Sequence, residues 1–328
     1  MKVVVYGPEK RTGALVGGKV VDLSRACTKY MREKKGERHA FTLGDALVPH
    51  DLLRLIESGR RAIDDAQASL DYLANAADDK DHRGESVTFD AAKVKIHAPR
   101  PTGTRIACAG SNFTSHRERM TVRSGRQIAA PFIWGFWKVS EQLASGSDVV
   151  YPARCDRLDY EGEAAVVIGK TGKDLKPADL KNYVWGVTLF CDWSIRSPRE
   201  PLGPMNFAIP KNWDGSGTLG PCIAVDEADC TNIDIETFVN GDRRQKHNTK
   251  EMTFSFGQYL EYLSRDFTLL PGDIICSGTG EGTAADASPV GPDGVQPPDL
   301  FLKVGDKVEV KSPQIGTLRG QIVAKKKA

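Results

Sequence analysis

Three kinds of feature are missing from this sequence of 328 residues, and each absence excludes a class of protein. The seven cysteines form no C-x-x-C pair. Single cysteines in odd number indicate reduced thiols rather than a disulfide framework, and they lack the spacing of a structural zinc site. No apolar run approaches the ~20 residues of a membrane span. The apolar run in MKVVVYGPEK is too short for a signal peptide, so we expect a cytoplasmic protein without membrane association.

An excess of charge of one sign is also missing. The 45 basic and 43 acidic residues leave a net charge of +2, which provides no general attraction for nucleic acid. The basic cluster at Lys325, Lys326 and Lys327 is interpreted as a solvated tail. With 40% hydrophobic residues, the chain has the composition of a globular protein with a large core.

The pattern of short apolar runs predicts an α+β protein that is mostly β. KVVVYG, GALVGG and KVVDL indicate strands near the N-terminus, and a helical period follows from Pro49 to about Ala76. Many short strands then follow without alternating long helices, which argues against a doubly wound parallel sheet and favours a rolled or barrel-like architecture. We expect a small α/β domain over residues 1–92 and a second, larger domain over residues 93–328.

Two acidic residues stand one residue apart in DYEGEAAVVIG. In an extended strand Glu161 and Glu163 project from the same face, where their charges repel unless water or a cation separates them. Asp192 ends another apolar run, VWGVTLFCD. Three carboxylates suit Mg²⁺, Mn²⁺ or Ca²⁺ better than zinc. The alternative is a solvent-facing polar strand edge.

His116 follows a Gly-Ser-Asn turn in AGSNFTSHRERM, which places it on a loop or at the start of a helix. A histidine there is a candidate general base, with Glu118 or Glu161 to orient it or tune its charge. The alternative is a polar surface or core histidine. H-x-E also begins the zinc deaminase signature, but no P-C-x-x-C follows in the sequence, which excludes that function.

PGDIICSGTGEGTA is a strand that ends in a glycine-rich loop. No helix of useful length follows the glycines, so this is not a dinucleotide-binding motif. The loop amides and the Thr279 hydroxyl are able to face a carboxylate or carbonyl of a small ligand. Lys211, in IPKNWDG, could neutralise such an acid, although a surface lysine is the alternative.

In this order, the motifs resemble those of the fumarylacetoacetate hydrolase family over roughly residues 100–320. The segments that carry the resemblance are GSNFTSH, YEGE, CDWSIR, PKNWDGSGTLGP, NGDRRQ, PGDIICSGT and FLKVGD. The resemblance implies a rolled, mixed β-sheet in the C-terminal domain, built around a magnesium or manganese site, and a homodimer. Calcium is also compatible with the carboxylates.

The resemblance also assigns roles to residues of this chain. It implies metal ligation by Glu161, Glu163 and Asp192, and catalysis by His116 and Lys211. Glu118, one residue before the position of the family's glutamate, is the further catalytic candidate. The residues that the resemblance implies for substrate binding are Thr279, Gly278, Asn112, Arg119 and Gln245.

The implied activity is hydrolysis of a C–C bond in a 3-acylpyruvate or 2,4-dioxo acid through a metal-bound enolate. The alternative enzyme is an isomerase, decarboxylase or hydratase acting on a 2-oxo acid at the same site. A third alternative is a metal-dependent binding protein without activity. In either enzymatic case the expected partner is a small anionic 2-oxo or 1,3-dicarbonyl acid.

The sequence departs from the family pattern at three positions near the expected site. Arg119 stands where many relatives have a glutamate, and Glu118 lies one residue earlier. Cys191-Asp192 replaces Asn-Asp, and Thr279-Gly280 replaces Thr-Pro in the glycine-rich loop. The arginines of this segment, which suggest either an anionic substrate or a solvated basic face, are Arg117, Arg119, Arg123 and Arg126.

Overall fold

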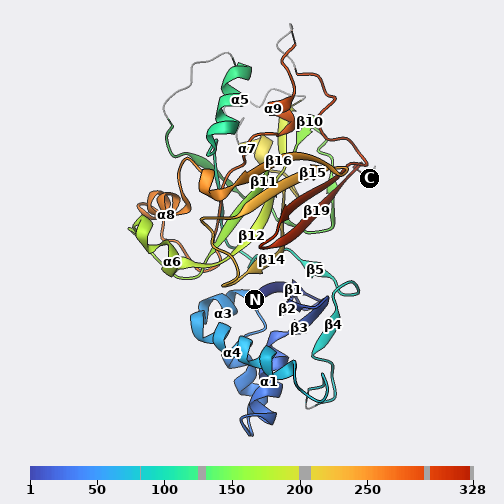
Figure 1. Ribbon diagram of the computed structural model, residues 1–328, viewed down its shortest axis with the longest axis vertical. Coiled ribbons are helices and arrows are strands. Elements are labelled where there is room, and N and C mark those ends of the chain that lie inside the picture. The colour runs from blue at the N-terminus through green and yellow to red at the C-terminus, as the bar shows by residue number, and fades with distance from the viewer. Residues whose placement is uncertain (82, 125–130, 199–207, 292–295, 326–328) are drawn as a thin grey trace.

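A mixed sheet of twelve strands runs through the molecule in the computed structural model, which describes residues 1–81, 83–124, 131–198, 208–291 and 296–325 (Figure 1). Its path is β4 (Thr88–Asp90), β3 (Lys19–Asp22), β2 (Arg11–Val16), β1 (Lys2–Tyr6), β14 (Gly217–Ala224), β12 (Val184–Asp192), β11 (Gly162–Ile168), β17 (Ile274–Cys276), β6 (Ile106–Ala109) and β7 (Gly135–Lys138). Two short strands lie off this path, β5 (Ile96–His97) beside β1 and β8 (Leu143–Ala144) beside β14.

A second sheet and a two-stranded ribbon complete the β structure. The second sheet contains β16 (Asp242–Asn248), β15 (Asp234–Val239), β18 (Lys307–Ser312), β19 (Gly316–Val323) and β9 (Ser147–Val150). The ribbon pairs β10 (Cys155–Asp159) with β13 (Ser194–Pro198). Strands account for 35% of the residues and helices for 24%, so the prediction of a mostly β, mixed-sheet fold is confirmed.

Four helices cover the N-terminal part of the large sheet: α1 (Leu23–Glu33), α2 (Ala40–Leu47), α3 (Leu52–Glu57) and α4 (Gly59–Leu73). The sequence predicted one helical stretch from Pro49 to about Ala76, and the structure divides it at Gly59, whose φ of +65° breaks the helix. Asp22 begins α1, which the sequence analysis did not predict, by accepting a hydrogen bond from the Arg25 amide at 2.8 Å.

The remaining helices are short and lie around the strand ends: α5 (Thr114–Ser124), α6 (Leu180–Tyr183), α7 (Ala208–Lys211), α8 (Phe256–Ser264) and α9 (Ala284–Ala287), with 3₁₀ turns at Pro177–Asp179 and Thr249–Glu251. Figure 1 shows α5, α7 and α9 together at the end of the molecule far from α1. Among the described residues, no helix is both long and apolar enough to cross a membrane.

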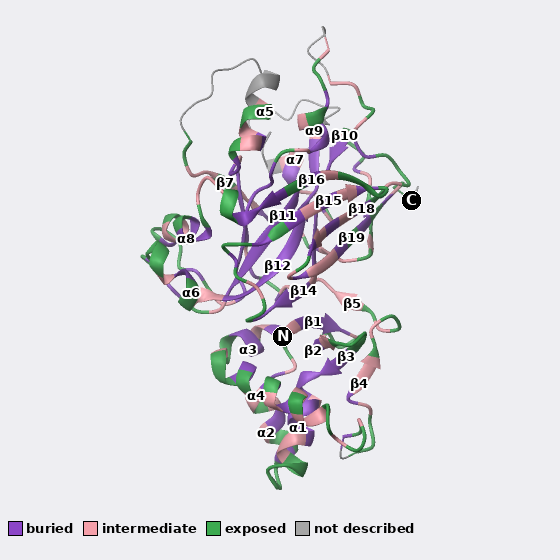
Figure 2. Ribbon diagram, in the orientation of Figure 1, coloured by how far each residue is buried: buried purple, intermediate pink, exposed green. Residues whose placement is uncertain are grey.

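Strand β11 lies at the centre of the core and is buried along its whole length (Figure 2). Ala164 and Val166 pack into the cluster that includes the second sheet. Ala165 and Val167 face the opposite way, into the cluster that includes the N-terminal helices. A strand with both faces covered needs apolar residues throughout, which explains the unbroken run AAVVI.

The two predicted domains share this sheet. Strand β1 pairs with β14, with Lys2 opposite Ala224 and Val3 opposite Ile223. Backbone hydrogen bonding therefore continues from the first strand into the C-terminal part, and the boundary at residue 92 stays a prediction. Of the C-terminal lysines, Lys326 and Lys327 lie outside the described residues.

Candidate active site

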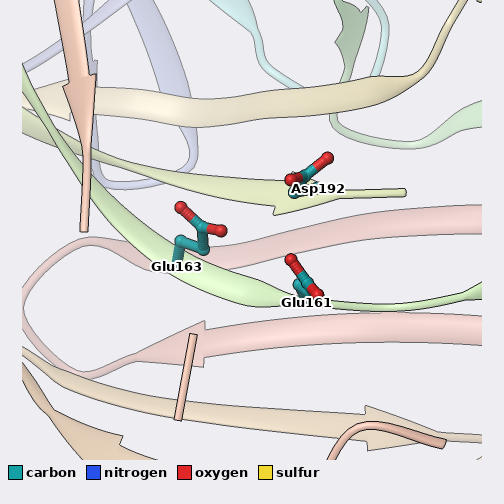
Figure 3. Close-up of side chains that lie close together, drawn as sticks. All are labelled: Glu161, Glu163 and Asp192. Atoms are coloured by element: carbon teal, nitrogen blue, oxygen red, sulfur yellow. The ribbon is translucent and has the colours of Figure 1, made fainter. Parts of the chain in front are cut away.

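Three carboxylates converge where β11 and β12 lie side by side (Figure 3). Gly162 pairs with Cys191, so Glu161 lies opposite Asp192, whose amide donates to the Glu161 carbonyl at 2.9 Å. Glu163 follows on the same face of β11. One carboxylate oxygen from each residue lies within 4.8 Å of the others. The exposed fractions are 6%, 1% and 0% for Glu161, Glu163 and Asp192, which excludes the solvent-facing strand edge considered from the sequence.

In the part of the chain that the structure describes, three cationic side chains surround these carboxylates. Lys211, on α7, places its Nζ 2.8 Å from Glu161 Oε2 and 2.9 Å from Asp192 Oδ2. Lys138, at the end of β7, forms an ion pair of 2.5 Å with Asp192 Oδ1. Arg196, on β13, bonds Glu161 through its Nη2 and Asp159 through its Nε at 2.8 Å. Buried charges require such partners, so the cations allow the acids to remain inside the protein.

The surroundings separate the pKa values of the two glutamates. Burial acts to raise the pKa of Glu161, but Lys211, Arg196 and His116 together hold it well below its usual range. Burial raises the pKa of Glu163 far above its usual range, and Cys108, Asp192 and Glu161 add to the effect. Glu161 is therefore the ionised member of the pair, whereas Glu163 retains its proton to a higher pH than an ordinary glutamate.

The donor set fits a divalent metal ion. The three residues provide oxygen ligands without imidazole or thiolate, as hard cations require. A cationic group, the Lys211 ammonium, already lies within hydrogen-bonding distance of two of the three carboxylates. The Gly278 amide donates to Glu163 Oε2 at 3.1 Å and orients this carboxyl group from outside.

Metal affinity is expected to rise with pH. Because burial raises the pKa of Glu163, binding a metal must displace a proton from this carboxyl group. Affinity should rise about tenfold per pH unit below that pKa and level off above it. Calorimetry in buffers of different ionisation enthalpy, from about pH 5 to about pH 8, measures both the affinity and the released proton. An affinity that does not vary over this range would contradict the assignment of Glu163.

His116 lies in the first turn of α5 and forms a buried pair with an acid that the sequence analysis missed. Its Nδ1 is 2.7 Å from Asp286 Oδ2, and the two side chains are 5% and 3% exposed. Asp286 also accepts from the Gly282 and Thr283 amides at 3.2 and 3.3 Å, so its carboxylate is held in place. Glu118, the acid proposed from the sequence, is exposed on α5. The geometry gives the orienting role to Asp286.

The glycine-rich loop is held against β11 by Thr279 and Gln245. The Thr279 hydroxyl donates to the Gly162 carbonyl at 3.0 Å and accepts from Gln245 Nε2 at 2.7 Å. Gln245 Oε1 in turn accepts from the Gly162 amide at 3.0 Å. Both residues therefore hold the loop and the backbone of Gly162, the glycine between the two glutamates, in place. In the same loop Gly278 has a positive φ of +75°, a conformation that favours glycine.

His247 explains why Gly280 follows Thr279 where relatives have a proline. A Cβ at residue 280 would lie 2.6 Å from Cγ of the His247 ring, closer than any such contact allows. The imidazole is buried, and burial lowers its pKa to about 3. His247 is therefore neutral at physiological pH and occupies the space of the missing side chain.

The other two candidate substrate-binding residues are Asn112 and Arg119, which lie just before and on α5. Asn112 is buried and uses its amide group to bond the backbone of Phe254 and Ser277, which joins the turn before α5 to the loop. Arg119 is exposed on α5 and pairs with Glu281. Of the other arginines in this segment, Arg117 is half-buried, the side chain of Arg123 is not among those described, and Arg126 lies outside the described residues.

Sequence reasoning missed three residues of the site, for different reasons: Asp286, Lys138 and Arg196, the last of which ends the motif CDWSIR but was given no role. Asp286 lies 170 residues from His116, so nothing in the local sequence connects the two. The one signal at Asp286 is the capping box Thr283-x-x-Asp286, which indicates the start of α9 but not a partner for His116. Lys138 ends the short apolar run GFWK, and a lysine at the end of a strand is usually exposed to solvent, so nothing in the sequence indicates that it is buried. In the structure its ammonium is buried and also donates to the Lys211 and Ser216 carbonyls.

Fold and site together define the class of protein. The model of the family described as "Fumarylacetoacetate (FAA) hydrolase C-terminal" matches residues 105–323. This chain belongs to the fumarylacetoacetate hydrolase family, and the resemblance found from the sequence motifs is confirmed.

Curated relatives and solved structures support this family. The chain is 31% identical over 319 residues to oxaloacetate tautomerase YisK of Bacillus subtilis (strain 168), covering 95% of this chain and 98% of that protein. It is 29% identical over 282 residues to mitochondrial oxaloacetate tautomerase Fahd2a of Rattus norvegicus, covering 85% and 82%. Maleylpyruvate hydrolase of Sphingobium sp. SYK-6, solved with manganese (II) ion and pyruvate, has the same fold, with a TM-score of 0.69 at 23% identity over 99% of this chain and 100% of that one.

Proposed function

We propose that this protein is a divalent-metal-dependent enzyme that catalyses proton transfer on a 2-oxo or 1,3-dicarbonyl acid, with keto–enol tautomerisation of oxaloacetate as the first reaction to test. The observation that carries the proposal is the buried His116–Asp286 pair beside three carboxylates and Lys211. The two relatives named as oxaloacetate tautomerases support the substrate. We propose Mg²⁺ or Mn²⁺ as the ion.

Glu161, Glu163 and Asp192 would hold the metal ion through one or more oxygens each. When bound, the ion would supply a Lewis acid that stabilises negative charge on the oxygens of the 2-oxo acid. Asp192 and Glu161 raise the pKa of Lys211 despite its burial, so its ammonium stays charged and provides a further positive charge for the same oxygens.

His116 and Asp286 provide the proton transfer. A carboxylate can only accept, so Nδ1 of the neutral imidazole carries the hydrogen that is bonded to Asp286, and Nε2 is left with the lone pair. Nε2 can take a proton from the carbon next to the oxo group and deliver it to the oxo oxygen, which converts the keto form into the enol form, and the reverse transfer restores the keto form. Thr279, Gly278, Asn112, Arg119 and Gln245 are proposed to line or support the substrate position.

Hydrolysis of the C–C bond of a 3-acylpyruvate, the first expectation from the sequence, is the second candidate. The same Nε2 could take a proton from water, and the hydroxide would attack the distal carbonyl. The C–C bond would then break, releasing a carboxylic acid and the enolate of pyruvate, which takes up the proton held by His116. The description of the matching family, a fumarylacetoacetate hydrolase, favours this reaction. Asp286 would stabilise the imidazolium that forms when water is deprotonated, as it would in the first reaction. The homodimer of the sequence analysis stays a prediction.

Ultraviolet absorbance separates the two reactions. The metal-stripped protein, with and without added Mg²⁺ or Mn²⁺, is mixed with freshly dissolved enol-oxaloacetate and, separately, with an acylpyruvate. We expect a metal-dependent loss of enol absorbance without a change of mass for oxaloacetate. Pyruvate and a carboxylic acid formed from the acylpyruvate would instead establish the hydrolase. No metal-dependent change with either substrate would refute both reactions.

A further inference from the structure

Two side-chain links connect α5 to the segment that follows Thr279. The inner link is the His116–Asp286 pair described above. The outer link joins Arg119 Nε to Glu281 Oε2 at 3.1 Å, and its side chains are 62% and 49% exposed. The outer link thus joins the same two segments as the inner one, but at the surface.

Helix geometry places Arg119 directly after His116 on one face of α5. Residues three apart share a helix face, and three residues advance the axis by about 4.5 Å. Glu281 lies between Thr279 of the loop and Asp286 of the inner link. The guanidinium therefore lies about one turn further along α5 than the imidazole, on the same helix face and nearer the solvent.

Among the described residues, the Arg119 guanidinium bonds Glu281 alone, which leaves most of its N–H donors available. It uses the Nε–H, whereas an arginine has five N–H donors in a planar fork. The two terminal nitrogens present an edge that matches a carboxylate with two parallel hydrogen bonds. Glu281 therefore orients Arg119 without occupying the edge that an anionic ligand would use.

We propose that Arg119, oriented by Glu281, is a specificity-determining residue that binds the second carboxylate of a 2-oxo dicarboxylic acid. This inference rests on the proposed function for the first carboxylate, which is placed at the three metal ligands. A diacid would then span the site, with the reacting carbon beside His116 and the far carboxylate at Arg119. A monoacid of similar length lacks the group that Arg119 binds.

The first test uses unreactive ligands. Calorimetry measures binding of malate and of lactate to the Mg²⁺-loaded protein, since both are 2-hydroxy acids and only malate has a second carboxylate. Arg119→Gln should weaken malate binding about 10- to 100-fold and leave lactate unchanged. Arg119→Lys keeps the positive charge but loses the planar guanidinium, so its affinity for malate should lie between those of the unmodified protein and Arg119→Gln. A matched control is Arg61→Gln on α4, where the arginine is 81% exposed and distant from the site.

Kinetics provides the second test and separates this inference from the proposed function. Arg119→Gln should raise KM for oxaloacetate with little change in kcat, whereas Glu281→Gln should keep or strengthen malate binding. Equal losses for malate and lactate, or no loss for either, would overturn the inference. If the unmodified protein prefers malate through Arg119 yet turns over no 2-oxo acid, the proposed function fails and the diacid site stands.

Discussion

Glu163→Gln is expected to reduce the affinity for Mg²⁺ or Mn²⁺ by more than about 100-fold, beyond the 10- to 100-fold cost of losing an outer-shell partner. Glutamine has the same size and can still accept the hydrogen bond from the Gly278 amide. It cannot ionise, so one of three anionic ligands is lost. The measurement is calorimetric titration of the metal-stripped protein.

The metal-free fold should tolerate this change, which separates a lost ligand from a damaged core. Burial raises the pKa of Glu163, so its protonated form is favoured in the metal-free protein, and neutral glutamine resembles that form. The Tm without metal should therefore be unchanged or higher, and the rise in Tm on adding metal should disappear. Glu57→Gln, at an exposed position of α3, is the control that should keep both values. Unchanged metal affinity in Glu163→Gln would remove Glu163 from the site.

His116→Ala is expected to retain the metal and lose about 10²- to 10⁴-fold in kcat, the usual contribution of a positioned acid or base. Asp286→Asn should lose activity as well, because an amide cannot stabilise the imidazolium as a carboxylate does. Asparagine keeps an oxygen for the Gly282 and Thr283 amides, so the loop should hold its shape. Steady-state kinetics and metal titration of both variants make the test.

Glu118→Gln is the informative comparison for this pair. Glu118 is exposed and Asp286 is buried against His116, so removal of the Glu118 charge should change kcat far less than Asp286→Asn does. The reverse order of effects would show that Glu118 orients the histidine during turnover, as the sequence suggested. Full activity in His116→Ala would show that another group moves the proton.

The cluster of three buried carboxylates could be predicted from the sequence for two reasons. Residues i and i+2 of a strand share a face, which fixes Glu161 relative to Glu163, and the seven family motifs place Asp192 beside them. The partner of His116 was not predictable in this way, because Asp286 is brought to it by the path of a long loop. Lys138 gave no signal, since burial of a lysine depends on the carboxylate and carbonyls around it.

The fold shows the same division between local and tertiary information. Short apolar runs predicted the strands around β11 and a fold that is mostly β. The break at Gly59 depends on a positive φ that the helical period does not reveal. The pairing of β1 with β14 joins residues more than 200 positions apart, so a boundary drawn from composition could not show that one sheet continues across it.

Exchange of hydrogen for deuterium tests most directly whether this site moves protons on a metal-held 2-oxo acid. Nuclear magnetic resonance follows loss of the C3 proton signals of 2-oxo acids in D₂O, with metal-stripped protein, with added Mg²⁺, and with the Glu163→Gln and His116→Ala variants. Our account predicts exchange above the protein-free rate only when metal, Glu163 and His116 are all present. Exchange that persists without metal, or that survives loss of His116, would contradict it.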